Sequence, residues 1–264
     1  MKKKEEAMEH LSSTQITLYL QCPRRYRFMY VDEIKPSFKS AAVAFGSAIH
    51  SAIAYLAEEK KRGNGFNLAK LISIFRADWE AQKCDELRFK EGENEGEFLD
   101  KGISLLKLVF EESKDWRIKA AELPFSVPIL DPSTGEEIIP VPLTGFIDLV
   151  LEPHVIIEIK TGIRKWSEEN IQNNIQVSLY AYAYRTLFGQ EPQVYFKILL
   201  RQRTPRIDNL VASRSQEDIE WSINLMKEVY EGIKSGIFFP NPGWYCPDCE
   251  YENLCKGKKG GKPC

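Results

Sequence analysis

The sequence has little net charge and few histidines. Its 264 residues include 36 Lys and Arg against 38 Asp and Glu, a formal charge of −2, and only 3 histidines. This balance excludes a protein that wraps nucleic acid over its whole surface, although it is compatible with a local basic groove. Long apolar runs are also missing. None approaches the about 18 residues that span a bilayer, so we expect no membrane contact.

We expect no secretory leader either. The first ten residues, MKKKEEAMEH, carry charges without an apolar segment, so we expect a cytoplasmic, reducing location and no disulfide framework. The residues that are present are sufficient for a folded core. With 43% hydrophobic and 11% aromatic residues, the composition excludes intrinsic disorder. Three of the 6 cysteines lie close together near the C-terminus, which suggests metal ligation.

Hydrophobic periodicity predicts a helical N-terminal part followed by an α/β part. Apolar residues at helical spacing predict helices over residues 12–21, 41–62, 66–83 and 97–113. Alternating or β-branched runs predict strands over 117–130, 138–151, 155–160, 193–200 and 206–211, and helices over 167–188 and 215–234. The predicted fold class is therefore α/β, with a mixed central sheet flanked by helices and a helical N-terminal cap.

Three charged residues lie in an otherwise apolar predicted hairpin. If residues 152–154 form the turn, Asp148 lies opposite Glu158, with about 4.5–5.5 Å between their Cβ atoms. Lys160 follows two residues later and points to the same face. The alternative is a charged, solvent-facing sheet edge, but the flanks are almost wholly apolar. Opposed carboxylates favour Mg²⁺ or Mn²⁺, which can activate water, and a neighbouring lysine can orient that water.

This pattern resembles the PD-(D/E)XK nuclease superfamily, and its RecB-like branch in particular. Asp148 matches the motif aspartate, Glu158-Ile159-Lys160 matches the (D/E)-x-K tripeptide, and Ile147 stands where the motif has proline. The resemblance implies a restriction-endonuclease-like core. It also implies metal ligation by Asp148, Glu158 and the Ile159 carbonyl, and catalytic roles for the two carboxylates and Lys160.

Five further positions match the same branch. Gly46 and His50 fit its G-x-x-x-H motif, which implies a histidine ligand to the metal; the glycine leaves space beside the imidazole. Gln176 and Tyr180 fit its Q-x-x-x-Y motif, which implies contact with DNA; packing on the sheet is the alternative for the tyrosines. Glu122 aligns with a first-strand glutamate, which implies a catalytic role near the metal. A peripheral ion pair is the alternative for Glu122.

The cysteines suggest a second metal centre. Cys246, Cys249 and Cys255 form C-x₂-C-x₅-C, and Cys22 is the natural fourth ligand. The arrangement resembles the iron–sulfur staple of RecB-like nucleases and implies a [4Fe–4S] cluster, although structural Zn²⁺ also accepts four cysteines. The cysteines at positions 84 and 264 have no motif partners. The staple implies a single domain over 1–264, made of a helical part (11–115), a nuclease core (116–236), the cysteine segment (237–256) and a basic tail (257–264).

The resemblance implies a Mg²⁺- or Mn²⁺-dependent DNA nuclease. Arg24, Arg25 and Arg27 interleave with Tyr26 and Phe28, so arginines for phosphates and aromatic rings for stacking on bases suggest a track for single-stranded DNA. We expect an exonuclease of repair or recombination that prefers single strands, with DNA and a helicase as partners. One alternative is a CRISPR-adaptation nuclease that trims DNA for integration proteins. The other is a non-catalytic DNA-binding or assembly module, which would be expected to lack part of the catalytic set.

Overall fold

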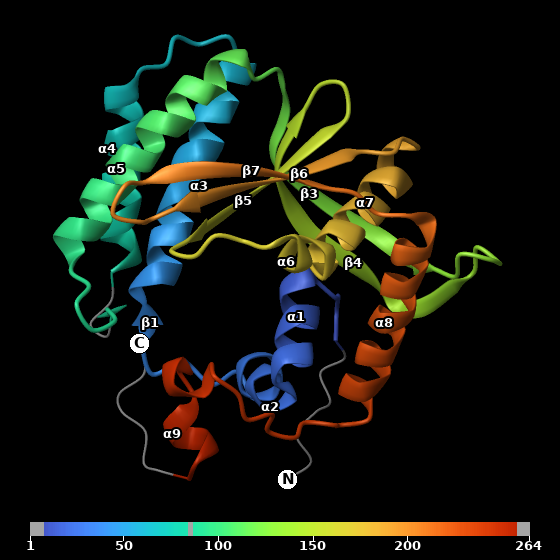
Figure 1. Ribbon diagram of the computed structural model, residues 1–264. Helices are drawn as coiled ribbons and strands as arrows, with labels where there is room; N and C mark the ends of the chain where they lie inside the picture. The colour runs from blue at the N-terminus through green and yellow to red at the C-terminus, as the bar shows by residue number, and fades with distance from the viewer. Residues whose placement is uncertain (1–7, 84–86, 258–264) are drawn as a thin grey trace.

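Five strands form one curled, mixed sheet in the computed structural model, which describes residues 8–83 and 87–257 (Figure 1). Their order across the sheet is β3-β4-β5-β6-β7, with β5 and β6 parallel and the other neighbours antiparallel. The predicted α/β class and mixed sheet are therefore confirmed. The strands are β3 (Ile118–Leu130), β4 (Glu137–Leu151), β5 (Val155–Gly162), β6 (Gln193–Leu200) and β7 (Arg206–Ala212).

Three helices of the N-terminal part cover one face of the sheet (Figure 1). They are α3 (Ala41–Lys61), α4 (Leu68–Gln82) and α5 (Glu95–Glu112). Phe45, Trp79 and Phe98 from these helices form one buried cluster with Leu149 and Ile157 of the sheet. Burial of this apolar surface fixes α3 against the strands that carry the predicted catalytic residues.

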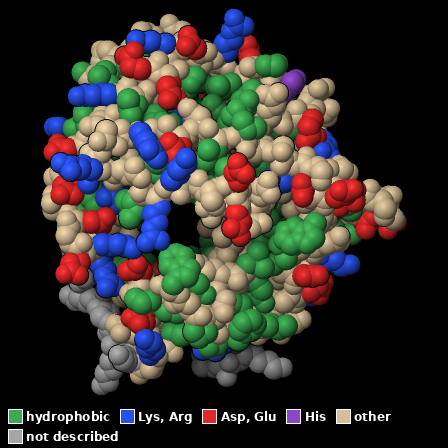
Figure 2. Space-filling model, viewed as in Figure 1, with side chains coloured by type: hydrophobic (Ala, Val, Ile, Leu, Met, Phe, Trp, Pro, Cys, Tyr) green, Lys and Arg blue, Asp and Glu red, His purple; other side chains and the backbone are tan. Residues whose placement is uncertain are grey.

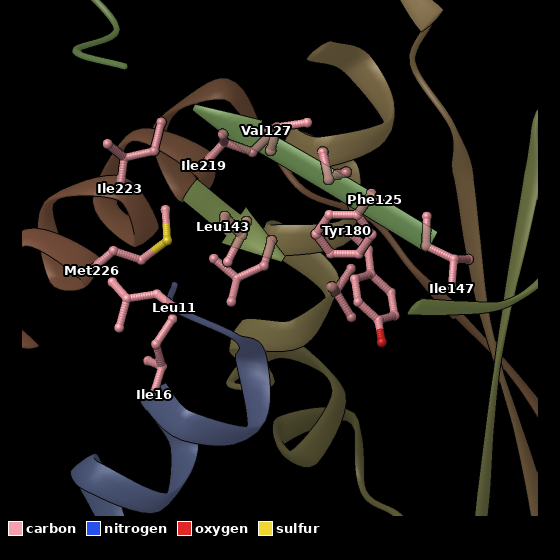
Figure 3. Packing of buried hydrophobic residues seen from close by; sticks show 14 of the residues in the cluster. Leu11, Ile16, Phe125, Val127, Leu143, Ile147, Tyr180, Ile219, Ile223 and Met226 are labelled. Atoms are coloured by element: carbon pink, nitrogen blue, oxygen red, sulfur yellow. The ribbon is translucent and has the colours of Figure 1, made fainter. Parts of the chain in front are cut away.

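Helices from both ends of the chain cover the opposite face. Leu11 and Ile16 pack there near Met226 and Leu143 (Figure 3). The Leu11 carbonyl also accepts the backbone N–H of Thr144 at 2.8 Å, which ties the N-terminus to β4. The expected N-terminal cap is thus divided between the two faces of the sheet. The helices on this face are α1 (Ser13–Gln21), α7 (Ile175–Phe188) and α8 (Gln216–Lys234).

Helix α3 differs from the expectation that no segment could span a membrane. In the described part of the chain it is the one helix long and apolar enough to do so by length and composition. Half of its apolar window is nevertheless buried inside the protein. Ala44, Ala48 and Ala52 recur every four residues and are fully buried, so they form one packed face. We therefore interpret α3 as the core helix of a folded domain.

The predicted helix over 167–188 is two helices, α6 (Glu168–Gln172) and α7. Ser167 begins α6 with a capping box. Asn174 begins α7, and its side chain accepts the backbone N–H of Gln176 at 3.0 Å. An asparagine side chain that caps a new helix competes with continuation of the preceding one, so the prediction of a single helix was wrong.

The N-terminal helices lie against the C-terminal segment. The Tyr245 hydroxyl donates to the Gln21 carbonyl at 2.7 Å, and Arg25 pairs with Glu250 at 2.9 Å. The positions 84–86 and the basic tail from 258 onward lie outside the described residues. The remaining short elements are α2 (Pro23–Tyr26), a π-helical turn (Arg27–Val31), β1 (Lys39–Ser40), β2 (Leu87–Arg88), two 3-10 turns (Ser113–Asp115 and Cys246–Asp248) and α9 (Glu252–Cys255).

Candidate active site

The β4–β5 hairpin carries Asp148, Glu158 and Lys160. Its pairing confirms the predicted register: Leu151 with Val155, Val150 with Ile156, and Leu149 with Ile157. Asp148 and Glu158 are the next residues along the two strands beyond the Leu149–Ile157 pair, where the regular pairing ends. Asp148 Oδ2 accepts the backbone N–H of Ile159 at 2.7 Å. This bond orients the carboxylate of β4 from the neighbouring strand.

Three side chains from three elements converge at the end of this hairpin. His50 comes from α3, Glu122 from β3 and Asp148 from β4. One ligand atom of each lies within 4.8 Å of the other two, and no other group of three His, Cys, Asp or Glu does so among residues 8–83 and 87–257. His50 Nδ1 lies 3.2 Å from Asp148 Oδ1. We refer to these residues as the three-donor group.

Glu122 has an unusual backbone conformation. Its φ is +46°, in the left-handed region that residues other than glycine rarely adopt. Ala121 pairs with Leu149 and Leu123 with Ile147, so Glu122 lies beside Asp148 across the sheet. Such a conformation costs on the order of 1–3 kcal/mol and is typical of functional sites. The convergence favours a role near a metal over the peripheral ion pair considered above.

Glu158 lies next to the three-donor group but is held differently. Its residue surface is only 3% exposed, and its Oε1 atom lies 2.5 Å from Lys160 Nζ. The other oxygen, Oε2, is buried without a hydrogen-bond partner among the described residues. An unpaired buried oxygen is costly and is available to bind a ligand; Gln15 Oε1 and Asp208 Oδ2 are the other buried side-chain oxygens without a partner among the described residues. The sequence led us to expect one set of metal ligands that includes Glu158. In the structure the three-donor group converges without Glu158, which lies beside it with one unpaired oxygen.

Burial and crowding change the acid–base properties of the site. Burial, with a contribution from the Asp148 carboxylate, raises the pKa of Glu158 to about 7 against the opposing effect of Lys160. Burial and then Asp148 also raise the pKa of Glu122. Burial acts to lower the pKa of His50, but the hydrogen bond and charge of Asp148 prevail and raise it. Like charges held this closely favour a bound cation.

The residues present fit a divalent metal ion. Carboxylate oxygens are the ligands that Mg²⁺ and Mn²⁺ prefer, and Mn²⁺ also accepts an imidazole nitrogen. The three-donor group supplies both kinds of ligand, and Glu158 Oε2 supplies a buried oxygen that lacks any other partner. Ile159 uses its N–H to hold Asp148, and ligation by its carbonyl stays a prediction.

A chain of hydrogen bonds holds the Lys160 ammonium group. Lys160 Nζ donates to Gln176 Oε1 at 2.7 Å, and Gln176 Nε2 donates to the Tyr180 hydroxyl at 2.6 Å. That hydroxyl donates to the Phe146 carbonyl at 2.8 Å. Tyr180 is 5% exposed, and burial raises its pKa strongly. The two motif residues therefore position Lys160, while their contact with DNA stays a prediction.

Arg214 supports this chain of hydrogen bonds, although nothing in its local sequence indicated such a role. Its Nη2 atom donates to the carbonyls of Ile171 at 2.7 Å and Asn174 at 2.9 Å. Its Nε atom donates to Ser178 Oγ at 3.0 Å. These bonds join the end of α6 to the start of α7, the helix that carries Gln176. Arg214 is thus a positioning residue: it holds the start of α7, and Gln176 on that helix in turn holds Lys160.

Gly46 lies where α3 comes close to β5. A Cβ atom there would lie 3.3 Å from Thr161 Oγ1, on the strand residue that follows Lys160. The glycine therefore allows the helix of His50 to approach the strand of Lys160 closely. The space expected beside the imidazole stays a prediction.

The four motif cysteines come from the two chain segments that lie side by side. All four are free, with Cys22 buried and Cys255 exposed. Burial raises the pKa of Cys249, and the charge of Cys22 contributes to the increase, so these two residues are neighbours. No three of the sulfurs lie within 4.8 Å of one another in the described part of the chain.

Arg24 and Arg25 bind the C-terminal segment. Arg24 Nε donates to the Phe238 carbonyl at 2.8 Å, and Arg25 pairs with Glu250. Both arginines are partly exposed, and their contact with DNA stays a prediction. Tyr26 is 2% exposed and stacks on the Phe238 ring, so it is not available to stack on a base as expected.

Comparison with known proteins agrees with this geometry. No curated protein matches the chain. The fold is similar to that of a protein described as "Putative exonuclease" from Eubacterium rectale, with 13% identity, a TM-score of 0.58, and coverage of 97% of this chain and 90% of that chain. The structure of SSO0001 aligns with 13% identity, a TM-score of 0.45, and coverage of 96% and 89%. The family model of the PD-(D/E)XK nuclease superfamily matches residues 10–256, and the chain therefore belongs to that superfamily.

Proposed function

We propose that the protein is a Mg²⁺- or Mn²⁺-dependent deoxyribonuclease of the RecB-like type that degrades single-stranded DNA from an end. The observation that carries this proposal is the three-donor group beside the buried Glu158–Lys160 pair. A non-catalytic module on the same scaffold would have no need to maintain this costly arrangement of charges. The complete set of residues therefore favours an enzyme.

Each residue of the site has a distinct role in this proposal. A bound divalent metal supplies a Lewis acid and lowers the pKa of its water. His50, Glu122 and Asp148 would hold the ion, and Glu158 would offer its buried, unpaired Oε2 atom as a further ligand. Lys160, fixed by Gln176, would orient the attacking water and stabilise negative charge that develops on the phosphate.

The surface of the molecule supports a single strand as substrate. Figure 2 shows an opening near the centre of the molecule, between the side formed by α3 to α5 and the side formed by α1 and α6. Lys and Arg side chains gather on the α3 to α5 side of this opening. We propose that a single strand enters this opening by a free end, as an exonuclease requires.

We also propose that the four cysteines hold a [4Fe–4S] cluster. Cys22 lies on the N-terminal segment and the other three cysteines lie on the C-terminal segment packed against it, as ligation by all four would require. Structural zinc, which also accepts four cysteines, is the alternative that the colour of the protein distinguishes. Anaerobically purified protein should be brown and absorb near about 400 nm. Colourless protein that contains zinc would refute the cluster.

A nuclease assay on end-labelled DNA tests the function. With Mg²⁺ or Mn²⁺, linear single strands should be degraded, whereas circular single strands and samples with EDTA should stay intact. Lys160→Ala should lower the rate about 10²–10⁴-fold. The exposed Lys107 on α5 provides a matched control, and Lys107→Ala should retain activity. Equal activity of Lys160→Ala and wild type would refute the proposed site.

A further inference from the structure

A groove leads away from the three-donor group along α3. It has a volume of about 530 Å³ and lies between the C-terminal half of α3 and β3. This volume is within the range of small-molecule binding sites. Its lining residues include His50 and Glu122 at one end, Tyr55 in the middle, and Glu58, Glu59 and Arg62 at the other end.

Tyr55 offers an aromatic surface at a suitable distance from the three-donor group. It is 38% exposed, and its ring is held by Phe66 with 5.6 Å between the ring centroids. Tyr55 follows His50 by five residues, which corresponds to about 7.5 Å along the helix axis. The two residues also differ by about 140° around the helix axis, so they border the groove on different sides. Tyr55 is the one aromatic residue among the described residues that line the groove, so a nucleotide with its phosphate near His50 has this ring available for its base.

The far end of the groove is unfavourable for a continuing strand. Arg62 lies 3.7 Å from a Glu58 oxygen and 3.2 Å from a Glu59 oxygen. These three residues together carry a net charge of −1. A further phosphate would meet this negative end, whereas a neutral sugar or base would not.

We propose that this groove binds the terminal nucleotides on the product side of the cut. A base stacks on Tyr55, and the Glu58–Glu59 end stops the strand and limits the length of the released product. This inference rests on the proposed nuclease function. It assigns to the groove a role in product length that the three-donor group alone does not supply.

Nucleotide binding tests the role of Tyr55 without any cleavage. Thymidine 5′-monophosphate and thymidine 3′-monophosphate are titrated into protein with and without Mg²⁺, and binding is followed by NMR. We expect at least one of them to bind, and Tyr55→Ala to weaken that binding about 5- to 150-fold. Tyr55→Phe should remain within about twofold, because it keeps the aromatic face.

Two further variants keep this test interpretable. Trp221→Ala removes another exposed aromatic residue, on α8, and should leave binding unchanged. Tyr55→Leu keeps an apolar contact for Phe66 if Tyr55→Ala fails to fold, and it should weaken binding to a similar extent. Binding by a folded Tyr55→Ala or Tyr55→Leu variant equal to wild type, or no nucleotide binding by wild type, would overturn the proposal.

Product length tests the negative end of the groove. The double variant Glu58→Gln, Glu59→Gln leaves Arg62 unpaired and changes the net charge of this end from −1 to +1. The longest fragment released from single-stranded DNA should become longer than that of wild type, and an unchanged length distribution would contradict the stop. If wild type cuts no DNA at all, the proposed function fails, while nucleotide binding still decides whether the groove is a nucleotide site.

Discussion

Glu158→Gln is expected to stabilise the metal-free protein above pH 7 while it abolishes nuclease activity. In the folded protein burial raises the pKa of Glu158 from its ordinary value near 4.5 to about 7. Between these two values the folded protein holds a proton that the unfolded chain has lost. The contribution of Glu158 to stability is therefore fully present below pH 4.5 and is lost as the pH rises through 7.

The size of this effect follows from the displacement of the pKa. Each pKa unit corresponds to about 1.4 kcal/mol, so ionisation of the buried carboxyl lowers the free energy of unfolding by about 3 kcal/mol in total. Glutamine has nearly the same shape, carries no charge and still accepts a hydrogen bond from Lys160. The stability of Glu158→Gln relative to wild type should therefore rise by about 2–3 kcal/mol between pH 5 and pH 8.

Urea denaturation in EDTA, followed by circular dichroism at several pH values, measures this difference. Subtraction of the two proteins removes the contributions of titrating groups far from Glu158, which the substitution leaves unchanged, but not that of His50, whose pKa the Glu158 charge also raises. Mn²⁺ should stabilise wild type more than the variant, since an ion bound to the folded state adds about 2.7 kcal/mol at 100 times its Kd. A stability difference that stays constant from pH 5 to pH 8 would show that Glu158 ionises normally and would refute its buried, unpaired state.

Three other substitutions test separate parts of the structure. Arg214→Met should lower kcat up to about 100-fold with little change in KM, because Lys160 loses its support; Arg214→Lys should recover part of the loss, and a change confined to KM would contradict this role. Cys246→Ser should remove the absorbance near about 400 nm and destabilise the protein by up to about 5 kcal/mol in thermal unfolding, whereas a variant at position 84 should not. Gly102→Ala would place Cβ 2.3 Å from Phe75 Cζ and should lower the unfolding free energy by about 1–2 kcal/mol, while Gly65→Ala, with nothing within 4 Å, should be neutral.

The hairpin and the α7 contacts were predictable because local spacing determines them. Strand periodicity places Glu158 and Lys160 on one face, and the turn length sets the register that brings Asp148 beside them. The four-residue spacing of Gln176 and Tyr180 likewise places both on one side of a helix. These predictions required no knowledge of how distant segments pack.

The parts that sequence did not predict depend on contacts between distant segments. Arg214 reaches an Asn174 carbonyl 40 residues away, and neither position carries a motif that points to the other. The left-handed conformation of Glu122 is imposed by pairing on both sides of it, which an isolated strand sequence does not specify. The break before α7 did have a local signal in two consecutive asparagines, but the apolar period across it favoured one helix.

Buried charges elsewhere in the protein show why the site is distinctive. Three charged residues are fully buried in the described part of the chain: Glu158, Lys197 and Arg201. Lys197 pairs with Glu112 and donates to Asn209, and Arg201 pairs with Glu93 at 3.0 Å, so the fold satisfies both cations with carboxylates from its helical layer.

Glu158 alone among these three keeps an unpaired oxygen, and it does so beside a strained Glu122 and a second carboxylate. Gln15 and Asp208 also keep a buried oxygen without a partner, so what distinguishes Glu158 is the nearby Asp148 carboxylate, whose charge helps to raise its pKa. A single divalent cation would relieve the repulsion between the carboxylates and give the unpaired oxygen a partner. The unfavourable features of the site therefore share one explanation, and that explanation is also the requirement of the proposed chemistry.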